Sequence, residues 1–147
     1  MSSHLLDVRD LKTYFFTRRG IVKAVDGVSF TLDEGETMGI VGESGCGKSV
    51  TCYSILRLVA EPAGRIVGGQ VLYKGEDLLK KTASEMCRLR GREFSMILQE
   101  PMTALNPVFT IGSQVVEAVQ ISGKTAKPAL WERVKELLHL VRIPSPE

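Results

Sequence analysis

The chain has 147 residues, of which 44% are apolar and 24% are charged, a balance typical of folded globular domains and not of disordered chains. Its net charge of +2 gives no basic surplus of the kind that favours nucleic-acid binding. Three cysteines are too few for a disulfide framework. No run approaches the roughly 18 apolar residues of a membrane-spanning helix, and the charged start does not fit a secretory signal peptide.

The first third of the chain predicts an antiparallel hairpin and then a buried strand. Residues 5–16 and 22–32 are strand-like, the latter because apolar and polar side chains alternate, and a polar turn at 17–20 joins them. A further turn at 33–36 precedes the short apolar run 37–41. Such a run suits a strand that is buried on both faces.

A helix is predicted over residues 47–60, and it is followed by glycines that mark a loop, at position 64 and at 68–69. The apolar stripe of this helix comprises Cys52, Ile55, Leu56 and Val59. A short strand over residues 70–73 ends at the turn Lys74-Gly75. Thr82 and Glu85 then have the spacing of a capping box and predict a helix through Met86 and Leu89.

Residues 94–98 predict one more buried strand, and beyond Gln99 the pattern becomes helical. Two apolar stripes recur at helical spacing, formed by Ile111, Val115 and Val119 and by Leu130, Val134, Leu137, Leu138 and Val141. Alternating strands and helices up to residue 98 favour an α/β core, and the helical region after it resembles an added subdomain.

The most specific motif is Gly42-Glu43-Ser44-Gly45-Cys46-Gly47-Lys48-Ser49, which matches G-x-x-x-x-G-K-[ST] between a predicted strand and a predicted helix. Its glycines let backbone N–H groups point at phosphate oxygens, and the helix N-terminus adds the positive end of its dipole. Lys48 is predicted to reach the β- and γ-phosphates, and Ser49 to ligate Mg²⁺. The partly similar Gly123-Lys124-Thr125 has no preceding strand or first glycine, so we interpret it as chance.

Cys46 admits two interpretations, a redox-active thiol and a small residue that fills the loop, and we favour the second; Cys52 and Cys87 are predicted core residues. The single asparagine, Asn106, precedes a proline, which excludes the Asn-Lys-x-Asp element that reads guanine. An aromatic ring of Tyr14-Phe15-Phe16 could instead stack on adenine, although aromatic side chains in strands commonly pack in a core.

The loop sequence VGESGCGKSVT, the segment ILQEPMTALNP at 97–107 and KAVDGVSF at 23–30 together resemble the ATP-binding subunits of ABC transporters. More narrowly, they resemble the subunits that drive dipeptide, oligopeptide and nickel import, and the likeness covers essentially the whole chain. The resemblance implies an α/β P-loop NTPase of the ABC type, with N-terminal antiparallel strands and the start of a helical subdomain. It implies ATP and Mg²⁺ as cofactors.

The resemblance also implies roles for single residues. Gln99 matches the glutamine of the Q-loop, which reaches the Mg²⁺ and γ-phosphate region; it and Lys48 are the implied catalytic residues, and it and Ser49 the implied metal ligands. Phe15 aligns with the adenine-stacking aromatic residue, with Tyr14 second. Val50 replaces a common threonine and offers only its backbone N–H. The implied nucleotide-binding residues are Phe15, Gly42, Glu43, Ser44, Gly45, Cys46, Gly47, Lys48, Ser49 and Val50.

Three elements that the family uses for hydrolysis have no match: the signature, the strand that ends in Asp and a catalytic Glu, and the switch histidine. Ile121-Ser122-Gly123-Lys124 departs from the signature, and His4 and His139 lack the context of the switch. Because family subunits are much longer, we expect an N-terminal part of one, inactive in hydrolysis on its own. Residues 1–99 would belong to the ATPase core, and residues 100–147 would hold the Q-loop and the beginning of the helical subdomain.

The function implied is ATP binding, and hydrolysis in a full-length dimer, to drive the uptake of peptides or nickel. The implied partners are transmembrane permease subunits, a second ATP-binding subunit and, indirectly, an external solute-binding protein, with no nucleic acid. The implied location is the cytoplasmic face of the inner membrane. Two alternatives stay open: a truncated module that binds ATP without hydrolysis, and a soluble ABC ATPase of DNA repair or translation.

Overall fold

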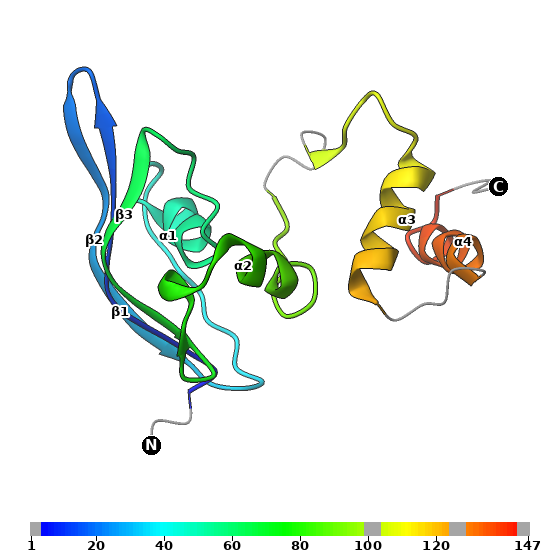
Figure 1. Ribbon diagram of the computed structural model, residues 1–147, viewed down its shortest axis with the longest axis horizontal. Helices are drawn as coiled ribbons and strands as arrows, with labels where there is room; N and C mark the ends of the chain where they lie inside the picture. Colours follow the sequence, from blue (N-terminus) through cyan, green and yellow to red (C-terminus); the bar gives the residue numbers. More distant parts are fainter. Residues whose placement is uncertain (1–3, 99–103, 124–128, 144–147) are drawn as a thin grey trace. The chain divides into compact units, whose positions relative to one another are not determined.

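The computed structural model describes residues 4–98, 104–123 and 129–143, and the chain divides into two compact units, residues 1–87 and 88–147 (Figure 1). Within the described residues, none of the helices has the length and apolar character needed to cross a membrane. The elements in chain order are β1 (Leu6–Thr17), β2 (Gly20–Leu32), α1 (Lys48–Ile55), β3 (Gly64–Tyr73), β4 (Glu76–Asp77), the 3₁₀ helix η1 (Leu78–Lys80), α2 (Ala83–Leu89), α3 (Ile111–Ser122) and α4 (Leu130–Leu140).

The first unit is built on an antiparallel sheet with the strand order β2-β1-β3-β4 among the described residues. β1 and β2 form the predicted hairpin, which is paired from Leu6↔Leu32 to Thr17↔Gly20. The alternation predicted for the second strand is also present, because Ser29 and Thr31 are exposed and the residues between and beside them are half-buried. The period-two pattern therefore correctly indicated which face of β2 is covered.

Helix α1 packs on one face of this sheet (Figure 1). The hydroxyl of Thr13 on β1 lies 2.7 Å from the hydroxyl of Ser54 on α1, which in turn donates to the carbonyl of Val50 at 2.6 Å. All polar groups of this buried pair are thus satisfied, as burial requires. The apolar core around it comprises Val8, Leu11, Val25, Ile55, Leu56, Val71, Leu78 and Met86.

Strand β3 is longer than predicted, because the glycines expected in a loop lie inside it. Gly69 adopts a φ of 95°, and a Cβ at this position would lie 2.6 Å from the Cα of Leu11 on the neighbouring strand. The β1–β3 register shifts at this point. The glycines therefore mark a bulge where two backbones approach closely and do not end the strand.

Two short-range predictions after β3 are confirmed. Lys74 and Gly75 form a turn in which both φ angles are positive, 49° and 83°, as tight hairpins favour. At the start of α2, the backbone N–H of Thr82 donates to the Glu85 carboxylate at 2.7 Å, and the N–H of Glu85 donates to the Thr82 hydroxyl at 3.3 Å. This reciprocal pair is the predicted capping box.

Two predicted strands are wrong. Residues 37–41 form no strand, and Val41 is 92% exposed. Residues 94–98 form no strand either: Phe94 is part of an isolated bridge with Arg90, and Ile97 is 96% exposed. A strand buried on both faces needs hydrogen-bonding neighbours and covering layers. Among the described residues the sheet pairs only β1 to β4, so neither apolar run has such a neighbour.

The helix after the phosphate loop and one of the core cysteines also differ from prediction. α1 ends at Ile55 instead of residue 60, and Arg57 then turns the chain with a φ of 53°. Cys52 is half-buried, but Cys87 is exposed. Met86 on α2 is fully buried, so the next residue along that helix points outward.

In the second unit, α3 and α4 pack through the predicted apolar stripes. Their core comprises Val119, Leu130 and Val134, with Val115, Val116, Leu137 and Leu138 packed against it. The two ends of the stripes are exposed, Ile111 at 52% and Val141 at 64%. The Thr110 hydroxyl caps α3 by accepting the N–H of Ser113 at 3.2 Å.

Candidate functional site

The glycine-rich loop leads directly into α1, as predicted. Gly45 and Gly47 have φ angles of 81° and 92°, in the left-handed region that suits glycine, and Gly47 is the N-cap of the helix. A Cβ on Gly45 would meet nothing within 4 Å, so the loop is open beside it. The backbone N–H groups at the start of α1 carry the partial positive charge of a helix N-terminus.

The ammonium of Lys48 lies folded back over this loop. Its Nζ donates to the carbonyl oxygens of Gly42 at 2.7 Å and Glu43 at 2.6 Å, and it lies 3.5 Å from Sγ of Cys46. The loop therefore holds a full positive charge next to the helix N-terminus. Two positive features at one place form an arrangement suited to a polyphosphate.

Gly47 anchors the loop to the sheet. A Cβ at this position would collide with the carbonyl oxygen of Ala24 on β2, so only glycine allows this approach. The hydroxyl of Thr51 donates to the Gly47 carbonyl at 3.0 Å and ties the loop to the first turn of α1. Sequence reasoning predicted Gly47 but assigned no supporting role to Ala24 or Thr51. The contact with Ala24 joins a loop to a distant strand and leaves no local pattern, whereas Thr51 lies four residues after Gly47 and could have been found from that spacing.

The other loop residues have the accessibility that a ligand-binding role requires. Glu43, Ser44 and Ser49 are exposed, whereas Val50 is half-buried. The Ser49 hydroxyl at the first turn of α1 offers one oxygen ligand. That suits Mg²⁺, which takes few protein ligands and completes its shell with phosphate oxygens and water. Cys46 fills the space above Gly42, since a Cβ on Gly42 would lie 2.6 Å from its sulfur.

The three aromatic residues at the end of β1 have different surroundings. The half-buried Phe15 lies against β3, where a Cβ on Gly64 would be 2.8 Å from its ring, and it shares the α1 face of the strand with Thr13. Tyr14 faces the other way, and its hydroxyl donates to Asp26 at 2.6 Å. Phe16 is 42% exposed.

Electrostatic shifts concentrate on the outer face of the hairpin, away from the loop. The hydrogen bond from Tyr14 lowers the pKa of the Asp26 carboxyl, and the same bond raises the pKa of the Tyr14 phenol. The ammonium of Lys23 lies 3.3 Å from Asp26 and 5.3 Å from the Tyr14 ring centroid. Tyr14 is therefore less suited than Phe15 to meet a base, because it lies on the face of the strand opposite α1 and Lys23 lies over its ring.

Several predicted residues lie outside the described residues or away from the loop. Gln99 lies outside them, as do Lys124 and Thr125 of the chance motif. His139 is exposed on α4. Nδ1 of His4 lies 2.5 Å from the Asp33 carboxylate.

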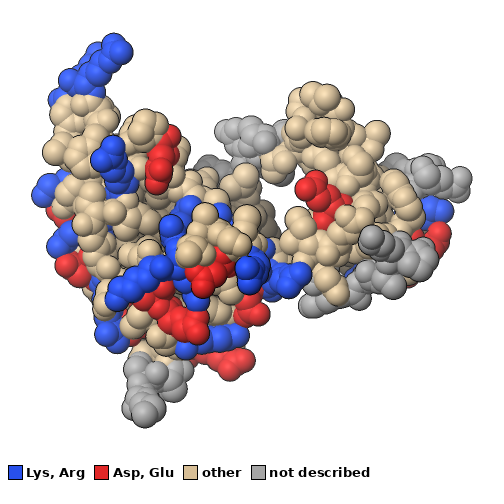
Figure 2. Space-filling model, in the orientation of Figure 1, with Lys and Arg blue, Asp and Glu red and all other residues tan. Residues whose placement is uncertain are grey.

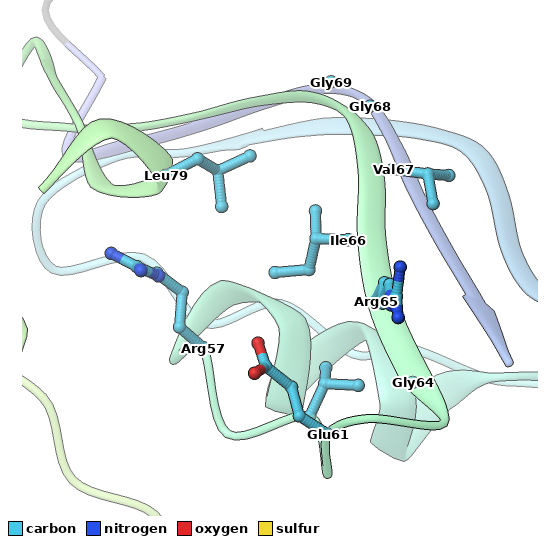
Figure 3. Close-up of a pocket in the computed structure, with 10 residues that line it drawn as sticks. Arg57, Glu61, Gly64, Arg65, Ile66, Val67, Gly68, Gly69 and Leu79 are labelled. Carbon is cyan, nitrogen blue, oxygen red and sulfur yellow. The ribbon is translucent and has the colours of Figure 1, made fainter. Parts of the chain in front are cut away.

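A separate pocket of about 520 Å³ lies between β3 and the segment after α1 (Figure 3). Ile66 and Leu79 project into it from opposite sides, and Arg57 at its edge donates to the carbonyls of Leu78, at 3.3 Å, and Lys81. No residue of the phosphate loop lines this pocket. It is therefore distinct from the candidate site.

The fold and the loop define a P-loop protein of the α/β class. A family model described as ABC transporter matches residues 25–146, and the chain belongs to this family. It has the fold of ABC ATPase cassettes: it superposes with a TM-score of 0.79 on the solved dimeric structure of MJ0796, a bacterial ABC transporter cassette, at 20% identity over 95% of this chain and 58% of that one. A second structure of that cassette, bound to ADP and Pi, gives the same values.

Sequence comparison gives similar proteins of greater length. The chain is 50% identical to the probable peptide ABC transporter ATP-binding protein y4tR of Sinorhizobium fredii, over 97% of this chain and 43% of that protein. It is 47% identical to the oligopeptide transport ATP-binding protein OppD of Bacillus subtilis, over 99% of this chain and 40% of that protein. The chain thus spans less than half the length of these curated relatives.

Proposed function

We propose that this chain binds ATP together with Mg²⁺ at residues 42–50. The proposal rests on the position of the Lys48 ammonium. Lys48 is the first residue of α1, and its ammonium donates to the carbonyls of Gly42 and Glu43 in the loop that precedes the helix. Backbone N–H groups of the loop would bind the phosphates, with Lys48 on the β- and γ-phosphates. Ser49 would hold Mg²⁺, which supplies charge neutralisation at the phosphates when bound.

The adenine base would stack on Phe15. Gly47 lies against Ala24 of β2. The neighbours of Ala24 pair with Thr13 and Tyr14 of β1, so the loop contacts the sheet close to Phe15. The resemblance to the family supports a further role for Gln99 near Mg²⁺ and the γ-phosphate. Residues 1–99 would then form part of the ATPase core, and residues 100–147 the Q-loop and the beginning of a helical subdomain.

At the level of the whole protein, we propose an ATP-binding subunit of an importer for peptides or nickel. The relatives whose names refer to peptide and oligopeptide transport support the peptide branch. Such a subunit would work with transmembrane permease subunits, a second ATP-binding subunit and, indirectly, an external solute-binding protein, at the cytoplasmic face of the membrane.

The full-length dimer would hydrolyse ATP, whereas these 147 residues alone would bind it without turnover. The support for this difference is the sequence, which has no match to the signature or to the strand that ends in Asp and a catalytic Glu. Without a carboxylate that orients water, the loop stabilises the bound ground state but not the attack on the γ-phosphate.

The test is a calorimetric titration of the chain with Mg-ATP, followed by Phe15→Ala and Phe15→Trp. Base stacking contributes about 1–3 kcal/mol, so we expect Phe15→Ala to weaken ATP binding about 5- to 150-fold, and Phe15→Trp to preserve it. If Tyr14→Ala greatly weakens ATP binding and Phe15→Ala does not, the base stacks on Tyr14 and not on Phe15. Failure of the unmodified chain to bind ATP would contradict the proposed function.

A further inference from the structure

The end of the β1–β2 hairpin carries an exposed surface that nucleotide binding does not use. This hairpin-tip surface comprises Phe16, Arg18, Arg19, Ile21 and Arg65. Figure 2 shows basic side chains gathered at this end of the hairpin. The two apolar members are 42% and 59% exposed, which leaves a mixed apolar and cationic surface open to solvent.

The strand register places these side chains together. Phe16 is directly opposite Ile21 in the β1–β2 pairing, so both side chains leave the same face of the sheet. Arg65 is opposite Tyr14 in the β1–β3 pairing and therefore shares that face, and its guanidinium lies 5.6 Å from the centroid of the Phe16 ring. This face is opposite α1. Thr13 contacts Ser54 of α1, and successive side chains of β1 point to alternate faces, so Tyr14 and Phe16 point away from the helix.

The turn presents the other two arginines in a defined geometry. The Thr17 hydroxyl donates to the Gly20 carbonyl at 2.8 Å and accepts the backbone N–H of Arg19 at 3.3 Å. Arg18 and Arg19 are both exposed at this turn. These hydrogen bonds fix the backbone of the turn, so the two exposed arginines lie at the end of the hairpin, next to Thr17 and Gly20.

The positive charge of this surface is not balanced locally. In the part of the chain that the structure describes, no carboxylate lies within 4.0 Å of the guanidinium groups of Arg18, Arg19 or Arg65. Two exposed carboxylates of the hairpin are already engaged: Asp26 accepts from Tyr14 and Lys23, and Asp10 accepts from Lys12 at 2.8 Å. The surface is therefore complementary to an anionic partner.

We infer that the hairpin-tip surface docks on anionic phospholipid headgroups. Apolar side chains interleaved with arginines suit the boundary of a bilayer, where the apolar groups enter and the guanidiniums bind phosphate. Single-stranded nucleic acid binds largely by stacking its bases on aromatic rings, and here the Arg65 guanidinium already lies over one face of Phe16; binding to a polyanion such as heparin without binding to vesicles is the outcome that would favour a nucleic acid. The inference goes beyond nucleotide binding and does not depend on it.

Sedimentation with vesicles tests this docking on the full 147-residue chain. We expect binding to mixed phosphatidylglycerol–phosphatidylcholine vesicles but not to pure phosphatidylcholine, and weaker binding as salt rises. Since each arginine near an anionic surface contributes roughly fivefold in affinity, Arg18→Gln with Arg19→Gln should lower the partition coefficient roughly 30-fold. Ile21→Thr, which keeps a β-branched residue in the strand, should lower it as well.

The matched control is Arg88→Gln with Arg133→Gln, which removes the same charge from exposed positions outside the hairpin and should change binding little. Lys48→Ala should also leave vesicle binding unchanged, so failure of ATP binding and failure of lipid docking are separate outcomes. Equal binding to both kinds of vesicle, an equal loss in the control, or binding to heparin or polyglutamate without binding to vesicles would overturn the inference.

Discussion

Single glycines determine the shape of the phosphate loop. At position 47 glycine is required because the loop approaches a neighbouring strand, a contact that the motif does not predict. Both Gly45 and Gly47 have positive φ angles, but only Gly47 lies against another strand, at the Ala24 carbonyl. The motif predicted the glycine; its contact with β2 could be found only in the structure. Gly47 therefore fixes the loop to the sheet, whereas Gly45 only shapes it.

The first prediction compares these two glycines. Gly45→Ala should cost about 1–2 kcal/mol of unfolding free energy, the usual cost of the left-handed region for an L-residue. Gly47→Ala adds a clash with backbone and should cost about 1–3 kcal/mol more, as overpacked sites do. Urea denaturation measures both variants, and equal losses would show that the approach of the loop to Ala24 is not tight.

The second prediction concerns the phenol of Tyr14. Its hydrogen bond to Asp26 raises its pKa, so the folded chain holds this proton more tightly than the unfolded chain does. The stabilisation is therefore complete below the unfolded pKa and is lost as pH rises through the folded pKa. In ultraviolet titration, Asp26→Ala should return the Tyr14 pKa toward its ordinary value, whereas Glu117→Ala, an exposed carboxylate in the second unit, should leave it in place.

At the scale of elements, prediction from sequence succeeded where local chemistry determines structure. The β1–β2 hairpin, the Lys74-Gly75 turn and the capping box at Thr82 depend on neighbouring residues and are all present. The apolar runs at 37–41 and 94–98 depend on partners elsewhere, and they form no strand. Whether an apolar run is buried depends on the segments that pack against it, and the sequence of the run does not specify those segments.

The third prediction follows from the exposure of residues 37–41. Val41→Lys should change the unfolding free energy by no more than about 0.5 kcal/mol, as exposed substitutions do, and should reduce self-association of the chain. Leu11→Ala, at a fully buried position, should cost about 2–5 kcal/mol. Denaturation and light scattering measure the two effects; a large destabilisation by Val41→Lys would show that the segment is packed in solution.

The fourth prediction tests the capping box. Thr82→Ala removes the hydroxyl that accepts the N–H of Glu85 and should cost about 1 kcal/mol. Ser84→Ala, one residue before Glu85 and exposed, serves as the control and should be nearly neutral. If both variants lose the same stability in urea denaturation, the reciprocal hydrogen bonds do not form in solution.

At the scale of the molecule, the family follows from motif and comparison together, whereas the arrangement of the site needed coordinates. The spacing of the loop predicted which side chains meet phosphate, and α1 begins at Lys48 as that spacing requires. It did not predict that Phe15 would lie against Gly64 while Tyr14 is engaged by Asp26. Those differences depend on strand register, which the sequence specifies only through long-range packing.

The affinity of Lys48→Ala for Mg-ATP shows whether residues 42–50 form the ATP site. Removing the ammonium takes away the positive charge that Lys48 is proposed to place on the β- and γ-phosphates, and we expect affinity to fall more than about 100-fold, which corresponds to about 2.7 kcal/mol. Lys80→Ala, whose side chain is 77% exposed, should bind ATP like the unmodified chain. An affinity of Lys48→Ala within about twofold of the unmodified chain, or about 0.4 kcal/mol, would contradict the assignment of residues 42–50 as the ATP site.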